Sequence, residues 1–449
     1  MALIVQAANF VAPRSGGIRT ALDALGRGYL AAGHDRVLLV PGPRDADTTT
    51  PAGRRVSLRG LPLPSSGGYR VLVERGRVLR LLERLGPDRL EVSDKLTLRC
   101  IGPWARARGV PAVLVSHERL DQLLALWLPG SATAPGLARA WNRRLATAFD
   151  TVVCSTSWAA EEFRNLDLGA GRVAEVPLGV DLAAFHPGNA SPRLRRRLAP
   201  DGGPLLVYAG RLATEKRPEL AVAALAELLD RWPRARLAVA GSGPLAPRLA
   251  GLAAGLPVSF LGHLADRREL AALLATADVA LAPGPVETFG LAVLEALASG
   301  TPVVVSRTGA LPELLGVPGP PRSPGSQGSP GPQRSPGPQR SPGSQRSPGS
   351  QASPGSQASP SPSGGGAPER EGSPQPGGGP EAVHRPEPAR VGPGLAAHPV
   401  ASAMADAIAA VLAWDPVERR ARARARAECF PWSTTVAGML GVHRLEAGS

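Results

Sequence analysis

Short apolar segments alternate with amphipathic segments along most of the chain, and this alternation restricts the possible folds more than any other feature. A buried strand is typically a short apolar run, whereas a helix repeats its apolar residues every three or four positions. Strict alternation of the two is typical of a parallel sheet whose strands are joined by crossover helices. The sequence therefore predicts an α/β fold.

The alternation occurs in two series. The first predicts strands over 2–7, 36–40, 112–115, 151–154 and 173–176, with helices over 19–32, 71–85 and 137–148. The second predicts strands over 204–208, 236–240, 258–261, 278–282 and 302–305, with helices over 219–230, 266–275 and 291–297. We therefore expect two Rossmann-like domains, each a doubly wound parallel sheet. They should face a cleft, because ligands bind at the carboxyl ends of parallel strands.

These series set the predicted boundaries, which are 1–186 for the first domain, 187–201 for a linker and 202–317 with 393–430 for the second. Residues 431–449 predict a C-terminal helix that packs back on the first domain. Residues 318–392 consist mainly of Pro, Gly, Ser and Gln, and 322–357 repeat RSPGSQ or a close variant six times. Because this segment lacks the apolar residues of a core, we expect a disordered insertion, with a proline-rich tether as the functional alternative.

Composition narrows the class of partner. The formal net charge of +14 would attract phosphate-rich molecules. Aromatic residues make up only 4% of the chain, however, and the arginines are spread among acidic residues, which argues against nucleic acid. We therefore expect an anionic membrane surface or an anionic small substrate.

Cysteine usage and hydropathy bear on the compartment. Cys100, Cys154 and Cys429 lie far apart and match neither a disulfide framework nor a CxxC metal site. No apolar run has the length of a membrane helix, and the first residues do not resemble an export signal. We expect a cytoplasmic protein.

Glycines and basic residues follow the first strand of each series. Gly16 and Gly17 open the first helix and would let backbone amides approach an anion, although a tight turn would use them equally well. In the second series, Gly210 is followed by Arg211 and Lys216. Lysine occurs at only two positions in this arginine-rich chain, so its use here favours a diphosphate site over a solvated loop.

Two carboxylates, Glu287 and Glu295, bracket a helix predicted to begin near Phe289. Residues eight apart lie on a similar helix face, and the first amides of the helix would point into the cleft. This arrangement favours the recognition of hydroxyl groups over a pair of solvated surface charges.

These motifs, in this order, resemble family four of the retaining glycosyltransferases, which transfers sugars from nucleotide diphosphates on a GT-B fold. Residues 176–181 (VPLGVD) and 185–187 (FHP) are also similar to that family, and the resemblance covers nearly all of the chain except the insertion. Within the family the chain resembles the actinobacterial GDP-mannose-dependent phosphatidylinositol mannoside (alpha-1,6) mannosyltransferases. The segments that carry this finer similarity are 9–10, 14–17, 67–70, 91–94, 116–120 and 282–285.

The resemblance implies a role for each motif residue. The catalytic set would be His117, Arg211, Lys216 and Glu287, with the two basic residues on the leaving diphosphate and His117 beside the donor sugar, although a lone histidine is more often structural. Donor contacts would come from those residues together with Gly16, Gly17, Leu264, Asp266, Phe289, Gly290, Leu291 and Glu295. Glu295 would accept from the ribose diol, and Asp266 would accept from guanine or instead cap its helix. Asn9, Tyr69 and Arg70 would contact the acceptor.

Such a reaction requires no metal, because fixed positive charges stabilise the departing phosphate, whose oxygen takes the acceptor proton. Magnesium is possible but is not indicated by the sequence. The DxD pattern Asp45-Ala46-Asp47 would suit a metal-dependent transferase, but it lies in a polar segment and is predicted to be a turn.

Residues 69–90 alternate a Val/Leu face with arginines, which would suit an anionic lipid surface or an ordinary core helix with a solvated face. We expect an enzyme that transfers mannose from GDP-mannose to a phosphatidylinositol mannoside at the cytoplasmic membrane face. The alternatives are a soluble member of the family with another nucleotide sugar and a small acceptor, and a basic scaffold without activity. The sequence does not indicate the oligomeric state.

Overall fold

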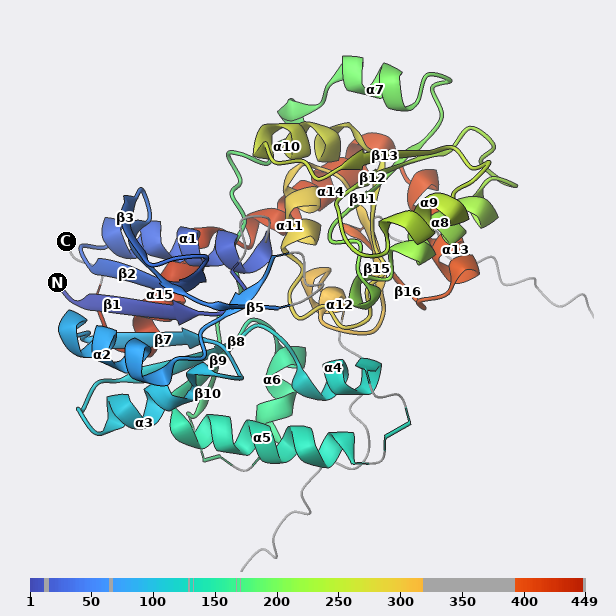
Figure 1. The fold of residues 1–449 in the computed structure, drawn as a ribbon. Coiled ribbons are helices and arrows are strands. Elements are labelled where there is room, and N and C mark those ends of the chain that lie inside the picture. The colour runs from blue at the N-terminus through green and yellow to red at the C-terminus, as the bar shows by residue number, and fades with distance from the viewer. Residues whose placement is uncertain are drawn as a thin grey trace, which may run out of the picture. The chain divides into compact units, whose positions relative to one another are not determined.

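The computed structural model describes residues 1–11, 16–63, 68–127, 130–131, 133–166, 168–169, 171–317 and 392–446. The predicted insertion, apart from Gly392, lies outside these ranges, as do the motif residues Arg14, Ser15 and Gly67. The strands of the described ranges form an eight-stranded, a six-stranded and a two-stranded sheet (Figure 1). The two predicted parallel sheets are therefore confirmed.

The first sheet has the order β10-β9-β8-β7-β1-β2-β4-β3. Its strands are β1 (Leu3–Ala8), β2 (Asp35–Gly42), β3 (Ala46–Thr50), β4 (Gly53–Arg59), β7 (Arg89–Ser93), β8 (Ala112–Ser116), β9 (Thr151–Cys154) and β10 (Val173–Glu175). Its described pairs are parallel except β3 with β4. Because the chain winds outward from β1 on one side and from β7 on the other, the strand order reverses between β1 and β7. A short antiparallel pair, β5 (Leu61–Pro62) and β6 (Arg70–Val71), forms the two-stranded sheet.

The second sheet has the order β13-β12-β11-β14-β15-β16, and its described pairs are all parallel. Its strands are β11 (Leu205–Ala209), β12 (Arg236–Ala240), β13 (Val258–Gly262), β14 (Val279–Ala282), β15 (Val303–Ser306) and β16 (Gly394–Ala397). The order reverses between β11 and β14. Ligands of open α/β sheets bind outside such a reversal, so β11 and β14 mark the position of a candidate site.

Helices cover both faces of each sheet. The helices are α1 (Gly17–Ala31), α2 (Arg75–Leu85), α3 (Ile101–Arg106), α4 (Leu120–Trp127), α5 (Ala134–Ala148), α6 (Ser157–Arg164), α7 (Pro192–Leu198), α8 (Pro218–Leu228), α9 (Ala246–Leu252), α10 (Arg267–Thr276), α11 (Leu291–Ala298), α12 (Leu311–Leu314), α13 (Ala401–Ala413), α14 (Pro416–Glu428) and α15 (Trp432–His443). The first sheet packs against α2, α3, α5 and α6 on one face and against α1 and α15 on the other. The second packs against α8, α9 and α13 on one face and against α10, α11, α12 and α14 on the other. None of the described helices is both long and apolar enough to span a bilayer.

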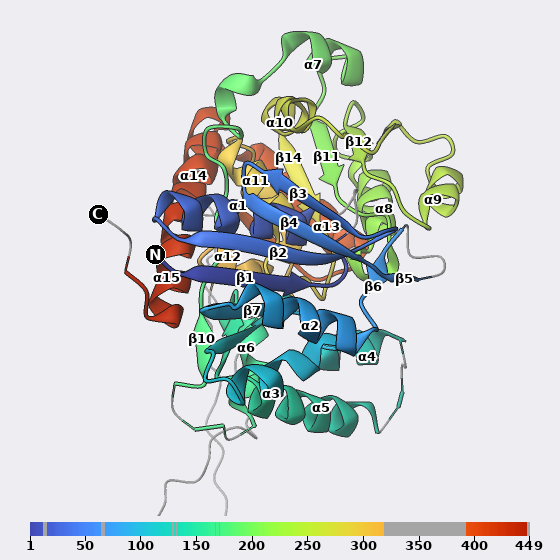
Figure 2. The same ribbon diagram turned by 60° about the vertical axis from the view of Figure 1, so that its left-hand side comes forward.

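The last helix, α15, lies beside α1 of the first sheet (Figures 1 and 2). The approach needs a glycine, since a Cβ on Gly28 would lie 2.2 Å from Val436. The buried Glu91 on β7 accepts from Tyr29 at 2.5 Å and from Gln6 at 2.7 Å, and His443 of α15 lies 2.8 Å from the same carboxylate. Burial would raise the pKa of Glu91, but its hydrogen bonds to His443, Tyr29 and Gln6 outweigh burial and lower it.

The arginine-rich helix α14 is a structural element of the second sheet. Its guanidinium groups donate to the last carbonyls of four other helices, where the helix dipole is negative. Arg419 reaches Val411 and Leu412 at the end of α13, and Arg420 reaches Ala277 beyond α10. Arg424 donates to Ala298 of α11 at 2.8 Å, and Arg426 donates to Glu313 of α12 at 2.9 Å.

Two predictions about local structure are wrong, and several strands were not predicted. Asp45 and Asp47 do not form a turn, because the chain enters the hairpin β3–β4 there and their carboxylates pair with Arg77 and Arg54. Helix α2 begins at Arg75 rather than residue 71, since 70–71 pair in β6, and its buried face of Val78, Leu81 and Leu82 packs into the core. The apolar side of this helix is therefore buried in the core, while contact of its arginines with an anionic lipid surface stays a prediction. Strands β3, β4, β5, β6, β7 and β16 were not among the predicted strands.

Candidate active site

Four of the predicted residues lie at the reversal of the second sheet. Arg211 and Lys216 follow β11, while Glu287 follows β14 and Glu295 lies on α11. The Lys216 ammonium is ion-paired with the Glu287 carboxylate, so the two loops are joined directly. Burial alone would lower the pKa of Lys216, but the nearby carboxylates, Glu287 first, outweigh burial and raise it. Lys216 is therefore cationic at neutral pH, and its remaining N–H donors can contact an anion.

The Arg211 guanidinium is more exposed than Lys216 and lies against an aromatic ring. Its central carbon is 5.3 Å from the centre of the Tyr69 ring, and Glu215 is 3.8 Å away. The hydroxyl of Tyr208 donates to the Arg211 carbonyl at 2.9 Å and fixes the backbone of the loop. A planar guanidinium held by stacking keeps its N–H groups for a bidentate anion.

Glu295 lies in an apolar setting, with 12% of its side chain exposed. Burial raises its pKa to about 7, opposed by Arg267, which donates to the carboxylate at 3.4 Å. Arg267 also approaches Thr20 of α1 at 3.5 Å and stacks on Phe185 at 4.9 Å. The group therefore titrates near neutral pH and can accept or donate a hydrogen bond to a hydroxyl.

The start of α11 matches the predicted range 291–297 and lies two residues beyond the start near Phe289 that the motif also suggested. The helix begins at Leu291, because Gly290 adopts a left-handed backbone with φ +93° and serves as its N-cap. A Cβ at Gly290 would also lie 2.3 Å from Leu311, so no other residue fits without rearrangement. The Phe289 side chain is buried and packs edge-on against Phe430, which leaves its backbone as the part that can face a ligand.

Glycines at the start of α1 lie against this region. Gly16 is the N-cap of α1, and a Cβ there would meet no atom within 4 Å. A Cβ on Gly17 would lie 3.8 Å from Leu291, so the amino-terminal end of α1 is close to that of α11. The structure thus brings Gly17 and Leu291 together, as the two predicted loops require.

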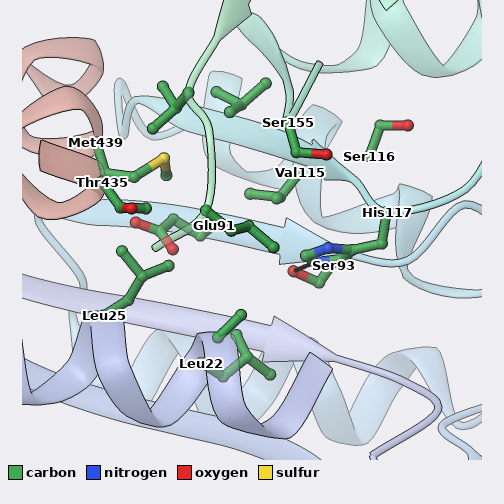
Figure 3. Close-up of a pocket in the computed structure, with 14 residues that line it drawn as sticks. Leu22, Leu25, Glu91, Ser93, Val115, Ser116, His117, Ser155, Thr435 and Met439 are labelled. Carbon is green, nitrogen blue, oxygen red and sulfur yellow. Dashed lines mark hydrogen bonds between the residues drawn. The ribbon is translucent and has the colours of Figure 1, made fainter. Parts of the chain in front are cut away.

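His117 follows β8 and lines a pocket between the first sheet, α1 and α15 (Figure 3). One ring nitrogen, Nε2, lies 2.9 Å from the hydroxyl of Ser93. Burial lowers the pKa of His117 to about 4, and the nearby Lys95 adds to the effect, so the imidazole is neutral at pH 7. Apart from His117 and Ser93, the pocket is lined mainly by apolar side chains of α1, α15 and the strand ends. The Glu91 carboxylate also lines it.

The residues predicted to contact the acceptor have different surroundings. Asn9 is fully buried, donates to Thr97 at 2.7 Å and accepts from the Leu72 amide at 2.9 Å, which is a structural role. Arg70 donates to the Gly60 carbonyl at 2.8 Å. Tyr69 packs edge-on against Phe10 and under Arg211, so it is the one of the three that reaches the basic loop.

Leu264 and Asp266 lie before α10. The Asp266 carboxylate accepts from the Arg268 amide at 2.8 Å and caps the helix, which is the simpler of its two predicted roles. Leu264 packs on the core of the second sheet. Neither contact excludes a ligand, since Asp266 is exposed.

Metal coordination has no obvious donor set here. The described residues contain no group of three or more His, Cys, Asp or Glu side chains placed to hold an ion. The carboxylates of the DxD pattern are each committed to an arginine.

Residues that the sequence interpretation missed join these loops. Arg267 bridges Glu295 and α1, Ser93 holds the His117 ring, and Thr288 donates to the His117 carbonyl at 2.5 Å. Arg267 and Thr288 each adjoin a predicted residue, Asp266 and Glu287, and that proximity was the available signal. Their partners lie far away in the sequence, so spacing could not reveal their contacts.

Comparisons with known proteins agree with this geometry. Residues 16–179 match the family described as glycosyl transferase 4-like domain, and 203–325 match glycosyl transferases group 1. Over 313 residues the chain is 51% identical to the GDP-mannose-dependent alpha-(1-6)-phosphatidylinositol dimannoside mannosyltransferase of Mycobacterium tuberculosis, covering 70% of this chain and 81% of that relative. The chain belongs to the group 1 glycosyltransferase family.

Two further matches of this group 1 glycosyltransferase have lower sequence identity. It is 29% identical over 318 residues to the GDP-mannose-dependent alpha-(1-6)-phosphatidylinositol monomannoside mannosyltransferase of Mycolicibacterium smegmatis, covering 68% of this chain and 80% of the relative. Among solved structures, sucrose-phosphate synthase from Thermosynechococcus elongatus superposes with a TM-score of 0.65 at 20% identity, over 99% of this chain and 98% of that chain. The predicted GT-B fold, the family resemblance and the assignment as a glycosyltransferase are confirmed.

Proposed function

We propose that this glycosyltransferase transfers mannose from GDP-mannose to a phosphatidylinositol mannoside. The observation that carries the proposal is the joined pair of loops at the reversal of the second sheet, where Lys216 and Glu287 meet beside Arg211. The choice of donor and acceptor is supported by the name of the Mycobacterium tuberculosis relative, 51% identical over 313 residues.

In this proposal Arg211 and Lys216 bind the donor diphosphate. Negative charge grows on the diphosphate as the sugar leaves, so fixed cations next to it lower the barrier more than they strengthen ground-state binding. The Glu287 carboxylate, which holds the Lys216 ammonium, also accepts from sugar hydroxyls, and the amides at 289–291 donate to them. Gly16 and Gly17 bring the start of α1 against the diphosphate.

Glu295 and the neutral His117 complete the donor contacts. Glu295 accepts from the ribose diol, and Asp266 with Leu264 contacts the base. An uncharged imidazole donates to or accepts from a sugar hydroxyl without competing for the diphosphate. The acceptor oxygen bonds to the anomeric carbon as the bond to the phosphate oxygen breaks, and that phosphate oxygen takes the acceptor proton on the same face, so the anomeric configuration is retained. Arg211 and Lys216 stabilise the charge of the departing diphosphate, so no metal is required.

The acceptor and its membrane form the last part of the proposal. Tyr69, against Arg211, is placed to contact the acceptor headgroup. The exposed arginines of α2, Arg75, Arg80 and Arg84, meet the anionic lipid at the cytoplasmic face, while the apolar side of that helix stays in the core.

A nucleotide panel tests the donor assignment. At equal concentration GDP should raise the melting temperature more than UDP or ADP, because a ligand that binds the native state stabilises it. A larger shift with UDP would overturn the guanine assignment and favour a family member with another nucleotide sugar and a small acceptor. Co-sedimentation with anionic vesicles, compared with Arg80→Ala/Arg84→Ala, tests the membrane contact.

A further inference from the structure

Thr288, between Glu287 and Phe289, makes hydrogen bonds in two directions. Its buried hydroxyl donates to the carbonyl of His117 at 2.5 Å. Its own carbonyl accepts from the hydroxyls of Thr156 at 2.9 Å and Ser155 at 3.3 Å. One residue of the β14–α11 loop therefore contacts two loops at the carboxyl ends of β8 and β9.

A second side chain from the same half of the chain contacts the turn between β9 and α6. The Glu313 carboxylate on α12 accepts from the amides of Ser157 at 3.0 Å and Trp158 at 2.7 Å. These are the first amides of α6, which have no partner within the helix, and the negative charge lies at the positive end of its dipole. Thr288 and Glu313 thus hold one turn from two positions.

The contacts of Thr288 lie directly beside two residues of the candidate site, Glu287 and His117. Glu287, next to Thr288, pairs with Lys216, and the His117 ring rests on Ser93. The Thr288 hydroxyl therefore connects the backbone of His117 to the loop that carries Glu287. A shift of this loop would move Glu287 relative to His117 without altering either side chain.

We propose that Thr288 is a positioning residue, which sets the placement of the His117 loop relative to the Glu287 loop for sugar transfer. The inference rests on the proposed function in that the sugar lies between these two loops. In the proposed function the nucleotide contacts groups of the second sheet and α1, whereas the Thr288 hydroxyl donates to the His117 carbonyl. Loss of the hydroxyl should therefore affect turnover and leave nucleotide affinity unchanged.

The test compares Thr288→Val, which keeps the shape and loses the hydroxyl, with Thr288→Ser, which keeps the hydroxyl. Thr288→Val should lower kcat on the order of 10- to 100-fold with the Kd for GDP within about twofold, and Thr288→Ser should restore most of kcat. Thr301→Val is the matched control, since Thr301 is also buried and its hydroxyl donates to the Leu274 carbonyl at 2.6 Å. This hydrogen bond involves neither the His117 loop nor the Glu287 loop. The kcat of Thr301→Val should stay within about twofold of the parent enzyme.

A second readout does not depend on transfer. Amide hydrogen exchange at Ser157 and Trp158 should accelerate in Thr288→Val and in Glu313→Gln, and should not accelerate in Thr301→Val. If the parent enzyme transferred no mannose from GDP-mannose, the proposed function would be wrong. The exchange rates would still test whether Thr288 holds the two loops in place. Unchanged exchange in Thr288→Val, a parallel loss of GDP affinity, or failure of Thr288→Ser to restore kcat would overturn the inference.

Discussion

Arg211 and Lys216 are held by different kinds of neighbour. Lys216 is paired closely with the Glu287 carboxylate. Arg211 stacks on Tyr69, and its acidic neighbour Glu215 lies 3.8 Å away. A lysine could not replace Arg211, because an ammonium neither stacks on a ring in the same way nor binds an anion through two parallel N–H groups. An arginine could not replace Lys216, because the planar guanidinium differs in shape from the compact ammonium. Both cations are available to a diphosphate, which is why each is expected to matter by itself.

Replacing Arg211 or Lys216 by alanine should lower kcat by a factor on the order of 10² or more while the protein stays folded. The reason is that each removes a positive charge beside a group that becomes more negative as the sugar leaves. Steady-state kinetics with circular dichroism as a folding check would measure this. Arg248→Ala, an exposed arginine on α9, is the control. Near-parent turnover in both variants would contradict the diphosphate assignment.

Glu295 gives a pH-dependent prediction. Its folded-state pKa of about 7 lies above the ordinary value of 4.5, so the folded chain binds the proton more tightly than the unfolded chain. Stability from this group is therefore complete below about pH 4.5 and is lost as the pH rises through 7. Glu295→Gln removes this titration. The difference in free energy of unfolding between the variant and the parent should therefore shift in favour of the variant by up to about 3 kcal/mol from pH 5 to pH 8. Urea denaturation at both pH values checks this, and an equal difference at the two would contradict the assigned burial.

At the scale of elements, the local pattern predicted most strands of both sheets but missed several, among them β7 and β3. β7 contains Glu91, a charge whose burial depends on His443, 352 positions away in the sequence. β3 carries Asp and Thr at the exposed edge of its sheet, where no apolar run is needed. The burial of Glu91 therefore depends on a distant part of the chain, whereas β3 is held by its hairpin with the adjacent β4.

Helix α14 shows the same limit for charge. Scattered arginines favour a solvated face, yet these side chains cap the ends of other helices. Part of the net charge of +14 therefore serves the core of the second sheet rather than a partner.

Two arginines of α14 form a matched pair for mutation. Arg424 is 19% exposed and donates to the carbonyls of Leu182, Phe185 and Ala298, whereas Arg422 is 60% exposed and faces Glu418 at 3.4 Å. Arg424→Ala should destabilise the protein by about 2 kcal/mol, because buried carbonyls lose a charged donor. Arg422→Ala should change stability by less than about 0.5 kcal/mol. Equal effects in urea denaturation would refute the capping role.

For the whole molecule, the sequence predicted both sheets, their order of appearance and the loops that carry the candidate site. It did not predict how Thr288 and Arg267 join those loops, since their partners at Thr156 and Thr20 belong to the other series of elements. Motif spacing identifies groups that act on a ligand, whereas groups that position one loop against another depend on tertiary contacts.

The insertion predicted between residues 318 and 392 tests the organisation of the second domain. β15 and β16 pair directly although the insertion separates them in the sequence, so the sheet is complete on either side of it. Closing a longer loop costs only about 0.6 kcal/mol per doubling of length. Replacing 322–388 with a short Gly/Ser linker should keep the melting temperature and GDP affinity close to the parent values. A large loss of either would show that the segment takes part in the fold or the site.

The most direct test of the account is transfer itself. Purified enzyme is mixed with GDP-mannose labelled in the sugar and with anionic vesicles that contain a phosphatidylinositol mannoside, and the label in extracted lipid is measured. Lys216→Ala and labelled UDP-glucose are the controls. The proposed function predicts labelled glycolipid from GDP-mannose with the parent enzyme, at least about 10²-fold less with Lys216→Ala, and none from UDP-glucose. Transfer from UDP-glucose, or no lipid label from GDP-mannose, would contradict it.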